Sequence, residues 1–530
     1  MEKTLLAMKE TPPLCKGGLW VLSVILSGAA KGCGVEESVM PSKERILRLR
    51  AFHTSLRMTY ELNDVVFLCR ATFYSKFIHI LLFDAIYGKL GARNLMKIQT
   101  GCDSMKINAK ELSYEQVLNA PRLQHKQPRK PSRLLATVVR IASLPTLWKT
   151  NFSYTTERME LVGKQPCLIL MNHSSFTDMK LAYGIFYPKR FGIVTSVDAM
   201  SGFLGKLMRF LGCTPTHKYV TDMTLIQDLE YMLKKNKTSV LMYPEAGYSF
   251  DGTATTLPRK MGVLMKRLGV PVVTVITQGA FARDPLYNML QIRDVKVSAH
   301  VKCIATAEEV KTLSVAELDA RLAESFSFDN FAWQRDNKVS IDVPFRADGL
   351  HRILYKCPHC GTENQMEGKG IHLTCHSCGK QWTMDEYGQL AATEGETEYP
   401  HIPDWYAWQR ECVRKELEDG TYLLDTDVDI AVQVNLDCVY MIGQGHLKHD
   451  LEGFHLTNAD GKLDYKQSPV ASHTLYSDYY WYEIADVIGI GNNEFSYFCF
   501  PKGDVSVTKA RLATEELYKL KKVRRKPVSV

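Results

Sequence analysis

The stretch CLILMNHSSFTD (residues 167–178) joins an apolar run to a histidine and a carboxylate. The run 167–171 is typical of a buried strand, His173 follows it at once, and Asp178 lies five positions later. Residues five apart on one α-helix are about 140° apart around its axis, so these side chains would not share a helical face. They meet only if His173 lies in the turn after the strand and Asp178 in the first turn of the next helix. The carboxylate then fixes the tautomer of the imidazole and leaves the second ring nitrogen available to accept a proton.

Further along the chain, apolar runs alternate with helical patterns. The runs lie at residues 191–195, 239–243 and 272–276. Asp198 and Asp222 are expected helix N-caps, and a third helix is expected to open at Pro258 and close at Gly269. The alternation predicts an α/β domain with a mixed, mostly parallel sheet flanked by helices. Ligands bind at the carboxyl ends of the strands in such sheets.

A second motif, YPEAGYSFDG (243–252), follows the apolar run at 239–243. Pro244 ends the predicted strand, Glu245 projects a carboxylate from the turn, and Gly247 permits close approach of the backbone. Because both motifs follow strands of the same predicted sheet, we expect them at the same edge.

NHSSFTD, followed by YPEAGYS and then VPVVTV (270–275), resembles the glycerolipid acyltransferase family, which includes the 1-acylglycerol-3-phosphate acyltransferases. The resemblance spans residues 150–300, and the His-x4-Asp block is its most specific part. It implies transfer of a fatty acyl group from acyl-CoA or acyl carrier protein to the hydroxyl of a lysophospholipid in phospholipid biosynthesis. The expected acceptor is 1-acylglycerol-3-phosphate. His173 would be the catalytic base and Asp178 would orient it.

The sequence departs from this family in the residues expected to bind the acceptor. Lys218 ends the second of the family's four blocks (212–218), where the family usually has an arginine. Ala246 and Tyr248 replace a glycine and an arginine of the third block, YPEAGYS (243–249). Arginine binds phosphate bidentately, so its loss leaves other acceptors open. The predicted substrate-binding residues are Glu245, Gly247, Lys218 and Arg259. Two alternatives remain: acylation of a non-phosphate lysolipid, or a zinc-ribbon scaffold with an inactive acyltransferase-like domain.

Four cysteines form two Cys-x2-Cys pairs: Cys357, Cys360, Cys375 and Cys378. This spacing is typical of a structural Zn²⁺ site, in which four thiolates close a tetrahedron and leave no position for water or substrate. Zinc ribbons often bind nucleic acid, but this segment lacks a basic, aromatic-rich face, so no nucleic-acid partner is expected.

Composition sets the general class of the protein. The 530 residues are 45% hydrophobic and 23% charged, with a net charge of +8, which is typical of a globular protein. The chain is too long for a disulfide scaffold despite its 14 cysteines, and a reducing cytoplasm is expected. Its longest apolar runs, 19–30 and 77–88, are shorter than the roughly 20 residues of a membrane span.

The chain is predicted to contain four parts. Residues 1–110 have no assigned role, 111–345 form the acyltransferase domain, 346–392 the zinc ribbon, and 393–530 a β-rich domain. The last part, with many short strands, a helix at 508–520 and a basic tail, resembles the small β-barrel of pleckstrin-homology-like domains. The basic stretch 121–133 and the apolar stretch 134–148 suggest either a peripheral contact with the inner face of the membrane or a linker and a packed helix.

Overall fold

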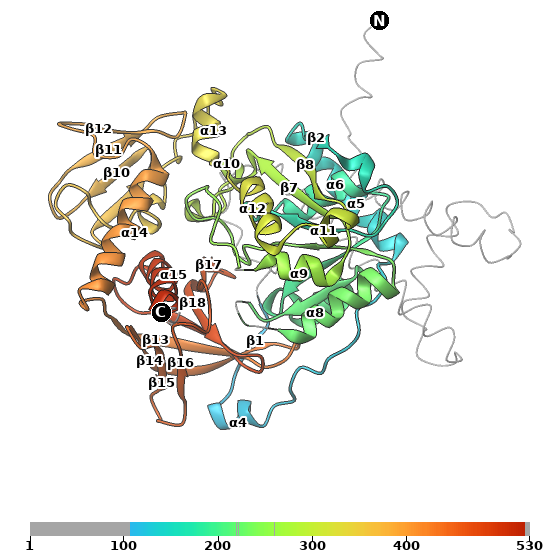
Figure 1. Cartoon of the computed structure of the whole chain (residues 1–530). Coiled ribbons are helices and arrows are strands. Elements are labelled where there is room, and N and C mark those ends of the chain that lie inside the picture. The colour runs from blue at the N-terminus through green and yellow to red at the C-terminus, as the bar shows by residue number, and fades with distance from the viewer. Residues whose placement is uncertain (1–106, 219, 221, 259, 525–530) are drawn as a thin grey trace, which may run out of the picture. The chain divides into compact units, whose positions relative to one another are not determined.

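The computed structural model describes residues 107–218, 220, 222–258 and 260–524 (Figure 1). All of them belong to one compact unit, residues 78–530. The apolar runs 19–30 and 77–88, and nearly all of the region 1–110, lie outside the described residues. Within the described part, no helix has both the length and the apolar character that crossing a bilayer requires.

A seven-stranded sheet forms the first half of the described chain. Its strands, in spatial order, are β2 (Ser153–Glu157), β8 (Ser298–Ala305), β7 (Val272–Gln278), β3 (Leu168–Met171), β6 (Ser239–Met242), β4 (Phe191–Ser196) and β5 (Cys213–Thr216). All neighbouring pairs are parallel except β7 and β8. The four predicted strands and the mixed, mostly parallel sheet are therefore confirmed.

Helices cover this sheet and pack in pairs, α5 with α6 and α9 with α12. They are α5 (Arg133–Lys149), α6 (Asp178–Phe186), α7 (Gly202–Phe210), α8 (Met223–Glu230), α9 (Met261–Leu268), α10 (Ala280–Arg283), α11 (Ala307–Thr312), α12 (Val315–Ser325) and α13 (Asn330–Asp336). Apolar side chains of β3, β6, β7, α9 and α12 form the core on one face of the sheet.

The predicted helix ends are partly right. Asp222 caps α8, because its Oδ1 accepts the Leu225 N–H at 3.0 Å, and Gly269 closes α9 in the left-handed conformation. The prediction for Asp198 is wrong: it begins a separate 3-10 turn, and the extended Ser201 precedes α7. Pro258 does not open α9, which starts at Met261 after a left-handed Lys260.

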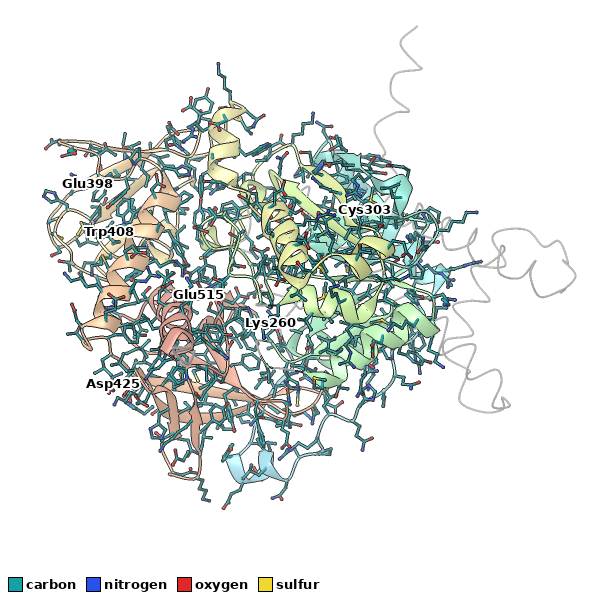
Figure 2. The ribbon with its side chains drawn as sticks, viewed as in Figure 1. Lys260, Cys303, Glu398, Trp408, Asp425 and Glu515 are labelled. Atoms are coloured by element: carbon teal, nitrogen blue, oxygen red, sulfur yellow. The ribbon has the colours of Figure 1, made fainter. Side chains whose placement is uncertain are left out.

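A small antiparallel sheet carries the paired cysteines. Its order is β12 (Leu390–Ala392), β11 (Gln381–Met384), β10 (His372–Cys375) and β9 (Met366–Lys369). Helix α14 (Ile402–Glu418) packs beside it: the ring of Trp382 on β11 lies 5.0 Å from that of Trp405 on α14. The indole of Trp382 also donates to Glu398, which is labelled in Figure 2, at 3.2 Å. The small sheet therefore shares its core with α14.

The C-terminal region is a larger β structure ending in α15 (Val507–Arg524), which packs on α14. Its strands, in spatial order, are β16 (Asp464–Gln467), β15 (Gly453–Asn458), β14 (Val439–Asp450), β13 (Leu424–Gln433), β19 (Ser496–Pro501), β18 (Ala485–Gly491) and β17 (Tyr476–Trp481). The short β1 (Ala109–Glu111), which precedes α4 (Tyr114–Leu118), adds to β14 in parallel.

Hydrogen bonds do not close this sheet into a barrel. Among the described strands, β16 and β17 are the two edge strands of the sheet, and they do not pair with each other. That differs from the β-barrel-like form expected from the sequence, while the antiparallel strands and the final helix are present. The likeness to pleckstrin-homology-like domains stays a prediction, as do the four domain boundaries.

Candidate active site

His173 and Asp178 meet as the sequence predicted. His173 lies in the turn after β3, Asp178 is the first residue of α6, and His173 Nδ1 is 2.9 Å from Asp178 Oδ2. The same carboxylate oxygen accepts the backbone N–H groups of Ser174 (2.9 Å) and Ser175 (3.2 Å). Asp178 is therefore held by the turn it follows, and its contact with Nδ1 leaves Nε2 as the proton acceptor. No hydrogen bond to Nε2 is present within the described part of the chain.

Asn172 fixes the same turn to the sheet. Its side chain is fully buried, and Oδ1 accepts both the N–H (2.8 Å) and the hydroxyl (3.1 Å) of Thr277 at the end of β7. Its amide donates to Ser174 Oγ at 2.8 Å. The start of the turn is therefore bonded to the neighbouring strand, which limits the movement of the histidine beside it.

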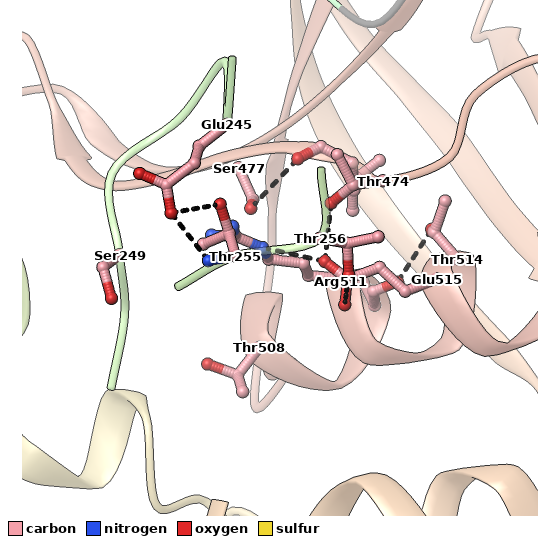
Figure 3. Close-up of polar contacts among 12 residues, drawn as sticks. Glu245, Ser249, Thr255, Thr256, Thr474, Ser477, Thr508, Arg511, Thr514 and Glu515 are labelled. Carbon is pink, nitrogen blue, oxygen red and sulfur yellow. Dashed lines mark hydrogen bonds and ion pairs between the residues drawn. The ribbon is translucent and has the colours of Figure 1, made fainter. Parts of the chain in front are cut away.

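Glu245 connects the two sequence motifs. One carboxylate oxygen accepts the His173 N–H at 2.9 Å, and the other accepts the N–H (2.7 Å) and hydroxyl (3.0 Å) of Thr255 (Figure 3). Burial raises the pKa of Glu245 to about 7, although these N–H donors oppose that rise. Both oxygens are satisfied within the protein, so the geometry makes Glu245 a positioning residue for the backbone of His173 rather than a surface for ligand.

Two tyrosines enclose the imidazole. Its centre lies 4.2 Å from the ring of Tyr243 and 3.8 Å from that of Tyr248, and Tyr248 stacks in turn on Phe176 at 5.1 Å. The His173 side chain remains 19% exposed, so the faces of the ring are covered while part of the side chain stays accessible. Burial lowers the pKa of His173 below 6.5, and the Asp178 contact opposes that effect. The imidazole is therefore neutral at physiological pH, the form a general base requires.

A cavity of about 900 Å³ opens beside this pair. It lies within the range of about 300–1,000 Å³ that is usual for ligand sites. Much of its wall is apolar and includes five methionines: Met179, Met208, Met242, Met261 and Met289. Methionine adapts its shape to flexible apolar ligands. The cavity can therefore accept an acyl chain next to the histidine.

Of the four predicted substrate-binding residues, Lys218 lines the cavity, whereas Glu245 and Gly247 do not. Lys218 lies in the cavity wall with His173, and its charge acts on the imidazole. Glu245 and Gly247 do not appear in the described lining, because both are buried in the loop behind it. Ala246 does line the cavity and has a left-handed φ of 54°, a conformation that favours glycine. Arg259 lies outside the described residues.

Residues 150–278 match a family model described as Acyltransferase. The chain contains an acyltransferase-family domain. A solved structure of the 1-acyl-sn-glycerophosphate (LPA) acyltransferase PlsC from Thermotoga maritima is similar at 18% identity, over 37% of this chain and 76% of that one. Its TM-score of 0.29 does not establish a shared overall fold. None of the curated proteins matches the chain.

The C-terminal helix reaches the third block of the acyltransferase domain. The guanidinium of Arg511 on α15 donates to the Tyr248 carbonyl at 3.2 Å and lies 4.3 Å from the centre of the Phe250 ring. Arg511 also pairs with Glu515 at 3.4 Å, and Glu515 accepts the hydroxyl of Thr256 at 3.2 Å (Figure 3). Sequence analysis missed this network because Arg511 and Tyr248 are 263 positions apart and no local pattern marks them.

The four cysteines gather in one cluster. Their sulfur atoms all lie within 4.8 Å of one another, and the Cys357–Cys378 and Cys360–Cys375 sulfurs are each 3.8 Å apart. Zn–S bonds of about 2.3 Å in a tetrahedron place sulfurs roughly 3.8 Å apart. The glycine after each pair, Gly361 or Gly379, has a left-handed φ and donates its N–H to the carbonyl of the first cysteine of the pair. The donor set and its geometry therefore fit a zinc ion.

Proposed function

We propose that the protein transfers a fatty acyl group from an acyl thioester, acyl-CoA or acyl carrier protein, to the hydroxyl of a lysolipid. The observation that carries this proposal is the His173–Asp178 contact beside the cavity, with a neutral imidazole and no hydrogen bond to Nε2 among the described residues. A lipid hydroxyl is a poor nucleophile at neutral pH, so it needs a base within hydrogen-bond reach.

In the proposed reaction, Nε2 of His173 takes the hydroxyl proton as the oxygen attacks the thioester carbonyl. Asp178 keeps the proton on Nδ1 and stabilises the positive imidazolium that forms. The tetrahedral intermediate then expels the thiolate, which receives the proton from Nε2, so an ester and a free thiol are the products. Tyr243 and Tyr248 hold the plane of the ring during both transfers.

The finer assignment concerns the acceptor. The resemblance to lysophosphatidate acyltransferases favours 1-acylglycerol-3-phosphate, with Lys218 and Arg259 as candidate phosphate ligands. The second alternative, a non-phosphate lysolipid, is favoured by the absence of arginine from the described cavity lining. The geometry at His173 argues against the inactive scaffold, because an assembled acid–base pair beside a large cavity serves no structural need.

We also propose a structural Zn²⁺ held by Cys357, Cys360, Cys375 and Cys378. The ion would fix the two cysteine turns to each other. Because all four ligands are protein thiolates, this site takes no part in acyl transfer.

The protein is proposed to attach to the cytoplasmic face of the membrane through α5. Leu134, Ile141 and Trp148 are 53%, 57% and 70% exposed and are spaced seven apart, which places them along one face of the helix. The basic residues Arg133 and Lys149 stand at its two ends. An exposed apolar stripe with flanking cations suits an anionic bilayer surface.

Sedimentation with anionic vesicles tests this attachment. The double variant Ile141→Ser/Trp148→Ser is expected to bind vesicles at least tenfold more weakly. Leu423→Ser, which removes an apolar side chain of similar exposure (54%) in the C-terminal region, is the matched control. Equal binding by all three proteins contradicts the proposal.

Acyl transfer is tested with the full chain, labelled palmitoyl-CoA or palmitoyl-acyl carrier protein, and lysolipids with and without phosphate. Formation of a diacyl product that depends on His173 supports the proposed function. His300→Ala is the matched control, because His300 on β8 bonds to Thr155 and Glu157 and does not line the cavity. Absence of product with every donor and acceptor contradicts it.

A further inference from the structure

The cavity beside His173 is built from two regions that are far apart in the sequence. The acyltransferase domain contributes the catalytic pair and most of the apolar wall. The C-terminal region contributes ten residues between Val470 and Glu483, most of them from β17 and the turn after it, and two residues of α15. The C-terminal region therefore forms part of the cavity wall.

Hydrogen bonds hold this second wall in place. Asp198, after β4, accepts the hydroxyls of Tyr476 at 3.0 Å and Tyr482 at 3.3 Å. The turn also has three non-glycine residues with left-handed φ values, Tyr480 (53°), Tyr482 (45°) and Glu483 (63°). Such conformations are costly and persist where surrounding contacts enforce them, most often at functional sites.

The charged groups of the lining are mostly acidic. Among the described lining residues there are three lysines (Lys218, Lys260 and Lys522), five carboxylates (Asp178, Asp198, Asp222, Asp478 and Glu483) and no arginine. Sites that bind phosphomonoesters instead concentrate positive charge and bidentate donors. The described part of the lining does not match a dianionic head group.

Lys218, the cation whose charge lowers the pKa of His173, has acidic residues nearby. Its ammonium lies 4.2 Å from the centre of the Tyr476 ring. Burial lowers the pKa of Lys218, while the nearby charges of Asp198 and Asp478 oppose that effect. The hydroxyls of Tyr476 and Tyr482 both bond to the Asp198 carboxyl group, so an incoming phosphate near Lys218 would also meet Asp198.

Arg511 does not supply the missing charge. The positive charge of Arg511 lowers the pKa of Lys218. Its guanidinium, however, donates to the Tyr248 carbonyl, pairs with Glu515 and lies against the ring of Phe250. It is 2% exposed and does not line the cavity.

We propose that the C-terminal wall is the acceptor-selecting part of the site and that the acceptor is a lysolipid whose head group carries no net negative charge. This inference rests on the proposed acyl transfer and names its acceptor class. Asp198 and Asp478, both in the cavity wall, are the residues that disfavour a phosphomonoester, and the bonds from Tyr476 and Tyr482 to Asp198 hold the loop in position.

The test uses the full chain, one labelled acyl thioester and three acceptors with the same oleoyl chain. These are 1-oleoylglycerol, 1-oleoylglycerophosphocholine and 1-oleoylglycerol-3-phosphate. At least one of the first two is expected to show a kcat/KM roughly tenfold above that of the phosphomonoester. Equal or better use of the phosphomonoester overturns the inference and leaves acyl transfer standing. No transfer to any acceptor overturns the proposed function and, with it, this inference.

Two variants test the wall directly. Burial raises the pKa of Asp478 to about 7, so the assay is run at about pH 8, where most of this group is ionised. Asp478→Asn is expected to raise the kcat/KM for 1-oleoylglycerol-3-phosphate about five- to tenfold relative to that for 1-oleoylglycerol, because one repelling charge is removed. Asp198→Asn keeps an oxygen for the two tyrosine hydroxyls and is expected to shift the ratio in the same direction.

The matched control is Asp425→Asn. Asp425 lies on β13, pairs with His446 and is outside the cavity (Figure 2). It is expected to leave the ratio of the two kcat/KM values unchanged. An unchanged ratio in both folded cavity variants overturns the assignment of the wall.

Discussion

The histidine–aspartate pair and the four-cysteine cluster both arise from short sequence motifs, yet their surroundings differ. His173 keeps 19% of its side chain exposed beside a cavity of about 900 Å³. The four cysteine sulfurs face one another within 4.8 Å. A catalytic group needs an open position for substrate, whereas a structural metal site uses every ligand position itself. The cavity beside His173, rather than the length or spacing of the sequence motif, therefore distinguishes a site that can admit a ligand from a closed metal site.

The two regions also differ in what holds them. The turn around His173 is fixed by buried hydrogen bonds from Asn172 and Glu245 to neighbouring strands and loops. The hydrogen bonds of the cysteine turns lie mostly within each turn, and the small sheet behind them packs Trp382 against Trp405 of α14. Loss of one side chain should therefore abolish function in the first region and local order in the second.

The largest expected effect is that of His173→Ala on catalysis. Removing the base should lower kcat by about 10²–10⁴-fold, because the hydroxyl then keeps its proton during attack. The melting temperature should change little, since the side chain borders a cavity and the Asn172 and Glu245 bonds remain. Steady-state kinetics and circular dichroism measure both quantities. Normal turnover by the folded variant would remove His173 from the mechanism.

Asp178→Asn is expected to lower kcat by about 10²-fold, because an amide does not stabilise the imidazolium. The pH profile gives a sharper readout. In the proposed reaction the neutral imidazole is the active form, so activity should fall as the pH drops through the pKa of His173, which lies below 6.5. Asp178 opposes the lowering of that pKa, so the acid limb should move to lower pH in the variant. A shift to higher pH would show that Asp178 does not act on His173 in this way.

Cys360→Ser should affect the metal far more than the chemistry. Zinc content should fall from one equivalent toward zero, and hydrogen exchange should increase around residues 357–380. The kcat should stay within about threefold, because four thiolates leave no position for substrate. Elemental analysis, hydrogen exchange and activity are measured on one preparation. Retention of one equivalent of zinc contradicts the ligand assignment, and complete loss of activity in an otherwise folded chain contradicts a purely structural role.

The smallest expected effect is that of Ala246→Gly on stability. The left-handed φ of 54° costs a residue with a Cβ about 1 kcal/mol or more, while glycine loses roughly 0.5–1 kcal/mol in backbone entropy. The net gain should be at most about 1 kcal/mol, seen as a slightly higher denaturation midpoint. Ala320→Gly, in the interior of α12, is the control and should destabilise the protein by a similar amount. Destabilisation by both changes would show that position 246 does not favour glycine.

Much of the fold and the contact between His173 and Asp178 could be predicted because the signals are local. Apolar runs identified β3, β4, β6 and β7, and the spacing of His173 and Asp178 predicted their contact. Prediction failed at Asp198, where an added turn separates the residue from α7, and in the C-terminal region, where a barrel was expected but the sheet stays open. Those features depend on contacts with distant segments.

The sequence by itself determined the alternating α/β pattern, the acid–base pair and the four-cysteine set, since each depends on residues joined by a short piece of chain. Only the tertiary structure decided which residues surround Lys218 and which residues complete the wall of the cavity. Tyr476 reaches Asp198 across 278 positions, and Arg511 reaches Tyr248 across 263. Contacts of this kind form when packed domains bring distant segments together, and burial then decides which charges a ligand meets.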